Sequence, residues 1–337
     1  MKDKNSSILK FIKPVIIYYA ASKVIKNYNL HSDYKPKSIS KVTLPPELTI
    51  EYSDIDINKI VSSKYKESVL KFVKVLIQNF SKDDLKIFYN NINSLKVKSK
   101  NTCIQSFIIK RKIIAGEYDP ENNEIIIDDN IIYSTIFHEL FHMASTIYKD
   151  DIYSGFYQSS LGRGLTEGYT EFLSRRYFPS NSNVVCAYEY LVFVSNKLEH
   201  IIGKEKMQRL YLNANLKGLI DELKLYTKEE DIMKFISNTD FLVEHMADRN
   251  LELFEKNMIG DCLKNINKFL ITCYSKKQQL EIKKDNIETL LKNIKDYSSS
   301  LVSNIEIHNH KYIVMTDKDV KEYIRLSFET TRDTKKI

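Results

Sequence analysis

A five-residue motif near the middle of the chain constrains the fold more than any other feature of the sequence. It reads His138-Glu139-Leu140-Phe141-His142 and lies in an apolar stretch with helical spacing from Ile131 to Ile147. Successive residues of an α-helix rotate by about 100°, so side chains four residues apart share one face. The two imidazoles can therefore hold one zinc ion, while Glu139 lies within reach of a water bound to that ion.

Two histidines do not complete such a site, because catalytic zinc usually takes three protein ligands and leaves a fourth position to water. The pattern that places Gly three and His six residues after the second histidine fails, since Ser145 and Tyr148 occupy those positions. A carboxylate from a following helix is the alternative. Glu167 and Glu171 lie one turn apart on one face of a predicted helix, which follows a glycine-containing turn and has Thr166 as its candidate N-cap.

The two motifs together resemble those of the gluzincin metallopeptidases, over the region from about Glu117 to Phe178. The resemblance is carried by His138-Glu139-x-x-His142, followed by Leu165-Thr166-Glu167-Gly168-x-Thr170-Glu171. It implies a single zinc ion with the ligands His138, His142 and Glu167. It also implies that Glu139 is the general base and that Glu171 orients His138. An assignment of Glu171 as the ligand stays open, because both carboxylates share one helical face.

These residues predict a zinc-dependent hydrolase, and a peptidase in particular. Zinc lowers the pKa of a bound water toward about 7, and Glu139 would take a proton from that water and pass it to the leaving amine. A Tyr or His that stabilises the oxyanion is also expected, and several residues qualify: Tyr169, Tyr188, Tyr190, Tyr211, His200 and His245. The alternative is a catalytically silent protein of zincin fold, in which zinc stabilises a binding or regulatory surface.

The predicted fold is α+β and zincin-like. Ile113–Tyr118 and Glu124–Asp128 have the composition of strands, and turn-forming residues between them indicate a hairpin that packs on the metal-motif helix. In such folds an edge strand can pair with an extended peptide, so a peptide or protein substrate is expected. Other N-terminal segments have strand or helix patterns, at Leu48–Tyr52, Tyr65–Phe80, Leu95–Ser99 and Ile104–Ile109.

The C-terminal part of the chain is predicted to be mostly helical. Helical spacing covers most of residues 184–300, including Leu251–Tyr274 and Gln278–Tyr297, and Gly203 is a candidate C-cap. A short hairpin follows, and then a helix from about Lys318. We therefore divide the chain into a basic leader at 1–45, a catalytic core at 46–182 and a helical domain at 183–337.

Charge distinguishes the leader from the rest of the chain. Residues 1–45 hold nine Lys and two Asp, so they carry all of the formal net charge of +7, and the remaining residues are neutral overall. The body of the protein therefore lacks the basic character of a nucleic-acid binder. Four widely spaced cysteines form no C-x-x-C pair, which argues against a structural zinc or redox site.

The sequence also predicts where the protein acts. No stretch reaches the roughly 18 apolar residues that span a bilayer, so no transmembrane segment is expected. The low cysteine content fits a reducing compartment, and a cytoplasmic protein is predicted. Val15–Ala21 follows several lysines, which leaves a secretory signal or a membrane-surface segment as the alternative. No feature of the sequence indicates an oligomeric state.

Overall fold

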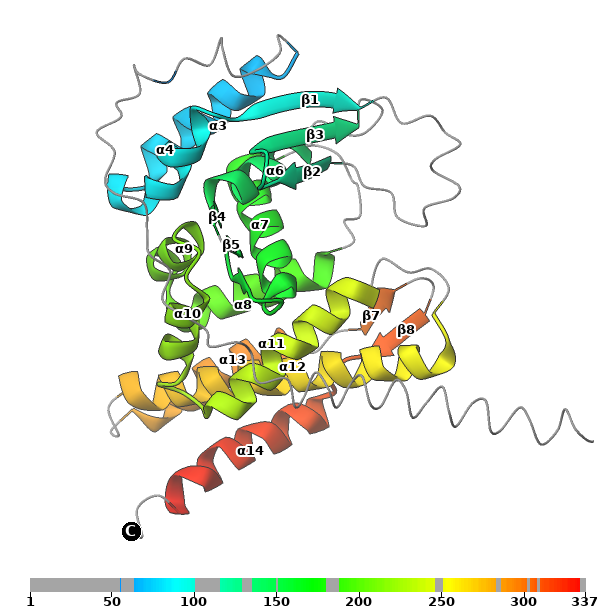
Figure 1. Ribbon diagram of the computed structural model, residues 1–337. Helices are drawn as coiled ribbons and strands as arrows, with labels where there is room; N and C mark the ends of the chain where they lie inside the picture. Colours follow the sequence, from blue (N-terminus) through cyan, green and yellow to red (C-terminus); the bar gives the residue numbers. More distant parts are fainter. Residues whose placement is uncertain are drawn as a thin grey trace, which may run out of the picture. The chain divides into compact units, whose positions relative to one another are not determined.

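The computed structural model describes ten parts of the chain: residue 55 and residues 64–100, 116–128, 135–149, 151–179, 188–245, 251–282, 286–301, 304–307 and 310–333. All of them belong to the larger of two compact units, Ile39–Ile337. Within them the structure is mixed α+β: the small sheets lie in the N-terminal part together with a few helices, and the C-terminal part is mostly helical (Figure 1). The predicted leader and the strands predicted at Leu48–Tyr52 and Ile104–Ile109 lie outside the described residues.

The first sheet has three strands in the order β1-β3-β2. β1 (Lys96–Lys100) pairs in parallel with β3 (Glu124–Asp128), and β2 (Gly116–Asp119) pairs antiparallel with β3 on the other side. The predicted hairpin is confirmed from Gly116 onward, and residues 113–115 of its first predicted strand lie outside the described residues. Asn123 in its turn takes a φ of 48°, a conformation that asparagine tolerates. Among the described strands of this sheet, β2 therefore lies at an edge.

The motif helix, α6 (Thr135–Ala144), packs against this sheet and against two earlier helices, α3 (Lys66–Asn79) and α4 (Lys86–Ile92). A short 3-10 helix, η2 (Lys82–Leu85), joins α3 to α4. Apolar residues of α6 are buried, and the Phe141 ring lies 5.0 Å from that of Phe72 on α3. The helix predicted at Tyr65–Phe80 and the strand predicted at Leu95–Ser99 are confirmed, each within one residue at its ends.

The motif helix ends at Ala144, earlier than the sequence pattern suggests. The side chains of Ser145 and Thr146 donate hydrogen bonds to the carbonyl groups of Phe141 and His142, so they satisfy acceptors of the last helical turn. A second sheet begins directly afterwards. Its strands follow the order β4-β5-β6, with bounds Thr146–Tyr148, Ile152–Ser154 and Tyr157–Gln158.

The second site helix, α7 (Arg163–Tyr177), has its N-cap four residues before the predicted one. Its N-cap is Gly162, in a left-handed conformation with a φ of 87°, so the assignment of Thr166 to this position is wrong. The Thr166 hydroxyl instead accepts the N–H of Phe156 and lies within hydrogen-bond distance of the carbonyl groups of Ser154 and Gly162. It therefore ties the second sheet to the first turn of α7.

Helices make up most of the remaining described residues. Their bounds are Glu189–Ile202 (α8), Lys204–Leu212 (α9), Leu216–Leu223 (α10), Glu229–His245 (α11), Leu253–Glu281 (α12), Ile287–Ser299 (α13) and Asp317–Asp333 (α14). A hairpin of β7 (Asn304–Ile307) and β8 (His310–Ile313) precedes α14, as predicted. Gly203 ends α8 as expected. None of the described helices has the length and apolar character needed to cross a bilayer.

One helix boundary in this part differs from the prediction. α12 continues to Glu281, through the break expected between Tyr274 and Gln278. No Gly or Pro interrupts that segment, and Ser275 is fully buried. The next helix starts where Asn286 accepts the N–H of Thr289 as an N-cap, so capping chemistry sets the boundary.

A single apolar cluster includes residues from β1 and β3, from the two site helices and from α8 to α14. This cluster includes residues on both sides of the predicted domain boundary between residues 182 and 183, and that boundary stays a prediction. Two cysteines, Cys262 and Cys273, lie within the described residues, and both are buried free thiols.

The start of α7 is docked closely on α11. A Cβ atom on Gly164 would lie 2.1 Å from the carbonyl oxygen of Thr239, so only glycine allows this approach of the two helices. Asp240 reinforces the contact, because its carboxylate accepts the N–H of Gly162 at 2.8 Å and that of Gly164 at 2.7 Å. The two hydrogen bonds satisfy donors at a helix N-terminus, where a carboxylate is also favoured by the helix dipole.

Replacement of Gly164 should therefore destabilise the fold. We expect Gly164→Ala to lower the free energy of unfolding by about 2 kcal/mol, because overpacking usually costs 1–3 kcal/mol. Gly260→Ala is the matched control, since an added Cβ in this α12 glycine meets its nearest atom at 3.6 Å. It should stabilise the protein by up to about 1 kcal/mol through helix propensity. Urea denaturation compares the two, and equal effects would contradict the docking argument.

Asp240 should also make stability depend on pH. Burial raises its pKa to about 7, although the N–H groups of Gly164 and Gly162 favour the ionised form. The pKa is about 4 in an unfolded chain, so the folded protein holds an additional proton between about pH 4 and 7. Binding this proton stabilises the folded state at low pH, and the stabilisation is lost as the pH rises through about 7. We expect wild type to lose stability relative to Asp240→Asn from pH 5 to pH 8 in urea denaturation; a constant difference would refute this.

Candidate metal centre

Two helices bring the three candidate ligand side chains together. His138 and His142 lie one turn apart on α6, and Glu167 approaches them from α7. The Nε2 atom of His138 lies 3.1 Å from Nε2 of His142 and 3.3 Å from Oε2 of Glu167. The Nε2 atom of His142 lies 3.6 Å from the same carboxylate oxygen. The three side chains form a group that could hold a metal ion.

The separations of these atoms fit a tetrahedral metal ion. Zinc binds histidine nitrogen and carboxylate oxygen at about 2.0–2.2 Å, so neighbouring ligand atoms of a tetrahedron lie about 3.3 Å apart. The three observed separations are 3.1, 3.3 and 3.6 Å, which are close to that length. Two imidazoles and one carboxylate suit zinc and other divalent transition metals.

The other ring nitrogen of His138 is held from behind. Its Nδ1 atom lies 2.9 Å from Oε2 of Glu171, so the carboxylate fixes the ring with Nε2 toward the other two ligands. Arg175 donates from Nε to Oε1 of Glu171 at 2.8 Å, and its Nη1 atom lies 2.8 Å from Oε2 of Glu189. Sequence reasoning missed Arg175, although its position four residues after Glu171 is the spacing of a helical ion pair.

Glu139 is buried beside the ligands and contacts strand β2. The backbone N–H of Tyr118 lies near its carboxylate and favours the ionised form. A Cβ on Gly116 would lie 3.1 Å from Cγ of Glu139 and 2.7 Å from a methyl group of Thr135, so the strand needs glycine to approach the helix this closely. A glycine inside a predicted strand is the signal that could have indicated this contact.

The carboxyl groups of the site differ in their affinity for protons. Burial raises the pKa of Glu139, and the nearby His138 and His142 only partly offset this. Burial would also raise the pKa of Glu167, but the charge of His142 and hydrogen bonds to both histidines hold it well below the usual value. Glu171 behaves similarly, since hydrogen bonds and charge from His138 and Arg175 outweigh burial and lower its pKa to about 2.

The same contacts raise the pKa of His138, whereas they lower the pKa values of Glu167 and Glu171. Burial would lower the pKa of His138, but hydrogen bonds to Glu167 and Glu171 raise it well above the usual value. The ring therefore lies in a strongly anionic environment. Such an environment also favours a cation that replaces the proton, as a divalent metal would.

Of the residues considered as donors to the oxyanion, Tyr188 has a ring that stacks on a candidate ligand, His138. Tyr188 is the N-cap of α8, and its ring stacks on that of His138 with 6.0 Å between centroids and an interplanar angle of 18°. The polar groups of the other candidates hydrogen-bond partners within the protein, in the pairs Tyr169–Glu199, Tyr190–Asn267, Tyr211–Thr170, His200–Asn196 and His245–Phe241.

Comparison with known proteins gives no relative from which a function of the site could be inferred. No protein-family model, curated protein or solved structure matches the chain. The resemblance to the gluzincin metallopeptidases is therefore confined to the two short motifs. The chemistry of the site has to be inferred from its own residues.

Metal binding should distinguish the two glutamates of α7. We expect wild type to bind one equivalent of Zn²⁺ in competition with a chromophoric chelator. Glu171→Ala removes only the support behind His138 and should weaken binding by roughly 10- to 100-fold. Glu167→Ala removes a direct ligand and should weaken binding far more. The reverse order would make Glu171 the ligand.

Proposed function

We propose that this protein is a zinc-dependent hydrolase, and specifically a peptidase of gluzincin type with a zincin-like core. The observation that carries the proposal is the position of a buried carboxylate, Glu139, beside a histidine–histidine–glutamate group with the spacing of metal ligands. A structural metal site needs only its ligands. A hydrolytic site also needs a nearby carboxylate that does not bind the metal, because this group acts as the base.

In this proposal His138, His142 and Glu167 would hold the metal, and Glu171 would orient His138. A metal ion bound there would act as a Lewis acid toward water and toward a substrate carbonyl. Glu139 would accept a proton at its carboxylate from the attacking water, and it would then deliver that proton to the leaving amine nitrogen. The N–H of Tyr118 lies near this carboxylate, and the close contact with Gly116 holds the side chain in place.

The position of β2 supports a peptide as the substrate. β2 lies at an edge of its sheet among the described strands, and the backbone N–H of its residue Tyr118 lies near Glu139. An extended peptide can pair with such an edge through main-chain hydrogen bonds. A peptide bound along β2 would therefore pass beside the proposed base. This arrangement suits an amide bond in an extended chain better than a small, isolated substrate.

Replacement of the base should separate metal binding from turnover. Glu139→Gln keeps the shape of the side chain but cannot accept the proton, so we expect cleavage of a peptide library to fall by roughly 10²- to 10⁴-fold. Zn²⁺ stoichiometry should remain at one. Glu121→Gln, which alters an exposed glutamate of the β2–β3 turn, is the matched control and should keep wild-type cleavage.

Two results would contradict the proposal in different ways. If Glu139→Gln cleaves as fast as wild type, Glu139 is not the base. If wild type binds one zinc ion but cleaves no peptide, and peptides do not displace a bound hydroxamate, the protein is a zinc-stabilised binding or regulatory protein instead.

A further inference from the structure

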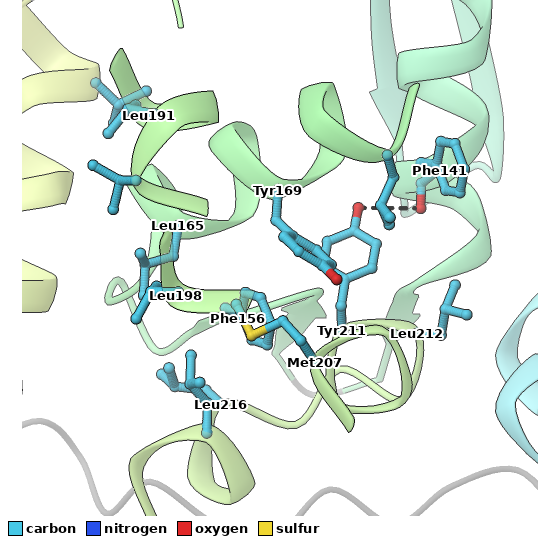
Figure 2. Close-up of a cluster of buried hydrophobic side chains, with 14 of the residues drawn as sticks. Phe141, Phe156, Leu165, Tyr169, Leu191, Leu198, Met207, Tyr211, Leu212 and Leu216 are labelled. Carbon is cyan, nitrogen blue, oxygen red and sulfur yellow. Dashed lines mark hydrogen bonds between the residues drawn. The ribbon is translucent and has the colours of Figure 1, made fainter. Parts of the chain in front are cut away.

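Tyr211 joins the two helices that carry the metal-site residues, although it belongs to neither. It lies on α9, and its side chain is fully buried. Its hydroxyl group hydrogen-bonds Oγ1 of Thr170 on α7. The same group lies 3.5 Å from the carbonyl oxygen of Phe141 on α6, along the dashed line of Figure 2. One phenol oxygen is therefore in contact with both site helices.

The two contact points lie next to the proposed ligands along the chain. Phe141 immediately precedes His142, and Thr170 lies between Glu167 and Glu171. A change in the separation of α6 and α7 at this point would alter the 3.6 Å distance between His142 Nε2 and the carboxylate oxygen of Glu167. The position of the Tyr211 hydroxyl is thus coupled to the geometry of the metal centre.

Other buried groups hold the phenol of Tyr211 in place. The Ser145 side chain lies close enough to the Tyr211 hydroxyl group to lower its pKa against the larger, opposite effect of burial, and it donates to the carbonyl of Phe141 at 2.9 Å. The ring packs against those of Phe156 and Tyr169, with centroid distances of 5.6 Å and 5.2 Å (Figure 2). Because the ring is enclosed on these sides, its hydroxyl group cannot turn toward a substrate without breaking this packing.

We propose that Tyr211 is a positioning residue of the metal centre, which sets the separation of α6 and α7 through its hydroxyl group and touches neither metal nor substrate. The inference rests on the proposed metal site. It replaces the role of an oxyanion donor that the sequence left open for Tyr211, because the hydroxyl group is engaged within the protein interior.

Removal of this hydroxyl group alone provides the test. Tyr211→Phe keeps the ring, and we expect its dissociation constant for Zn²⁺ to rise by about tenfold or more, as for other groups that act behind metal ligands. Tyr190→Phe is the matched control. It removes an equally buried hydroxyl group, which bonds Asn267 and the carbonyl of Leu263. Both variants should lower the urea midpoint, but only Tyr211→Phe should weaken Zn²⁺ binding.

Variants of the partner residue provide a second measurement that does not depend on Tyr211→Phe being stable. Thr170→Val removes the hydroxyl group and should weaken Zn²⁺ binding as Tyr211→Phe does, whereas Thr170→Ser keeps it and should bind as wild type. The double variant Tyr211→Phe/Thr170→Val should bind no more weakly than either single variant, because both remove one interaction.

The outcomes separate this inference from the metal site on which it rests. If wild type binds no Zn²⁺, the proposed metal centre itself is wrong. If wild type binds Zn²⁺ but Tyr211→Phe and Tyr190→Phe bind it with the same affinity, the metal centre stands and the positioning role of Tyr211 is refuted. Equal affinities of Thr170→Val and Thr170→Ser would refute it as well.

Discussion

The contact between α6 and α7 is the interaction on which the candidate metal centre depends. It brings His138 within 3.3 Å of Glu167 and 2.9 Å of Glu171, and all three side chains are largely withdrawn from solvent. Buried charges are costly unless they are paired, so each of these groups needs the others. If the helices moved apart, Glu167 would lose its contacts with both histidines, and Glu171 would keep only Arg175 of its own helix. The packing of the helices and the pairing of the charges therefore support each other.

Three separate parts of the chain hold α7 against its neighbours. The second sheet is joined to its first turn by the Thr166 hydroxyl, Tyr211 of α9 contacts its middle, and Asp240 of α11 binds its start. Two of these contacts come from helices that follow residue 183. The C-terminal helices are thus part of what positions the site, and a domain boundary near residue 183 would have these contacts crossing it.

The grouping of the candidate ligands could be predicted from the sequence because their geometry is local. Histidines four residues apart and glutamates four residues apart define helical faces, whatever surrounds them. The supporting contacts could not be predicted from the sequence, because their partners are distant along the chain. Thr170 and Tyr211 are 41 residues apart, and Gly164 and Asp240 are 76 residues apart. The error at Thr166 has a related cause. A threonine hydroxyl bonds backbone groups both at an N-cap and inside a first turn, so its presence does not identify the first residue.

The two carboxylates that flank the ligands lie in different environments, and this difference supports the roles proposed for them. Glu171 belongs to a chain of contacts that leads outward through Arg175, whose side chain is 36% exposed, to Glu189, which is 62% exposed. A cation therefore balances its charge, and it can hold His138 as an anion. Within the part of the chain that the structure describes, His138 and His142 are the cationic groups that act on Glu139, and burial still raises its pKa. A carboxylate in that position gains most from accepting a proton, which is what a general base must do.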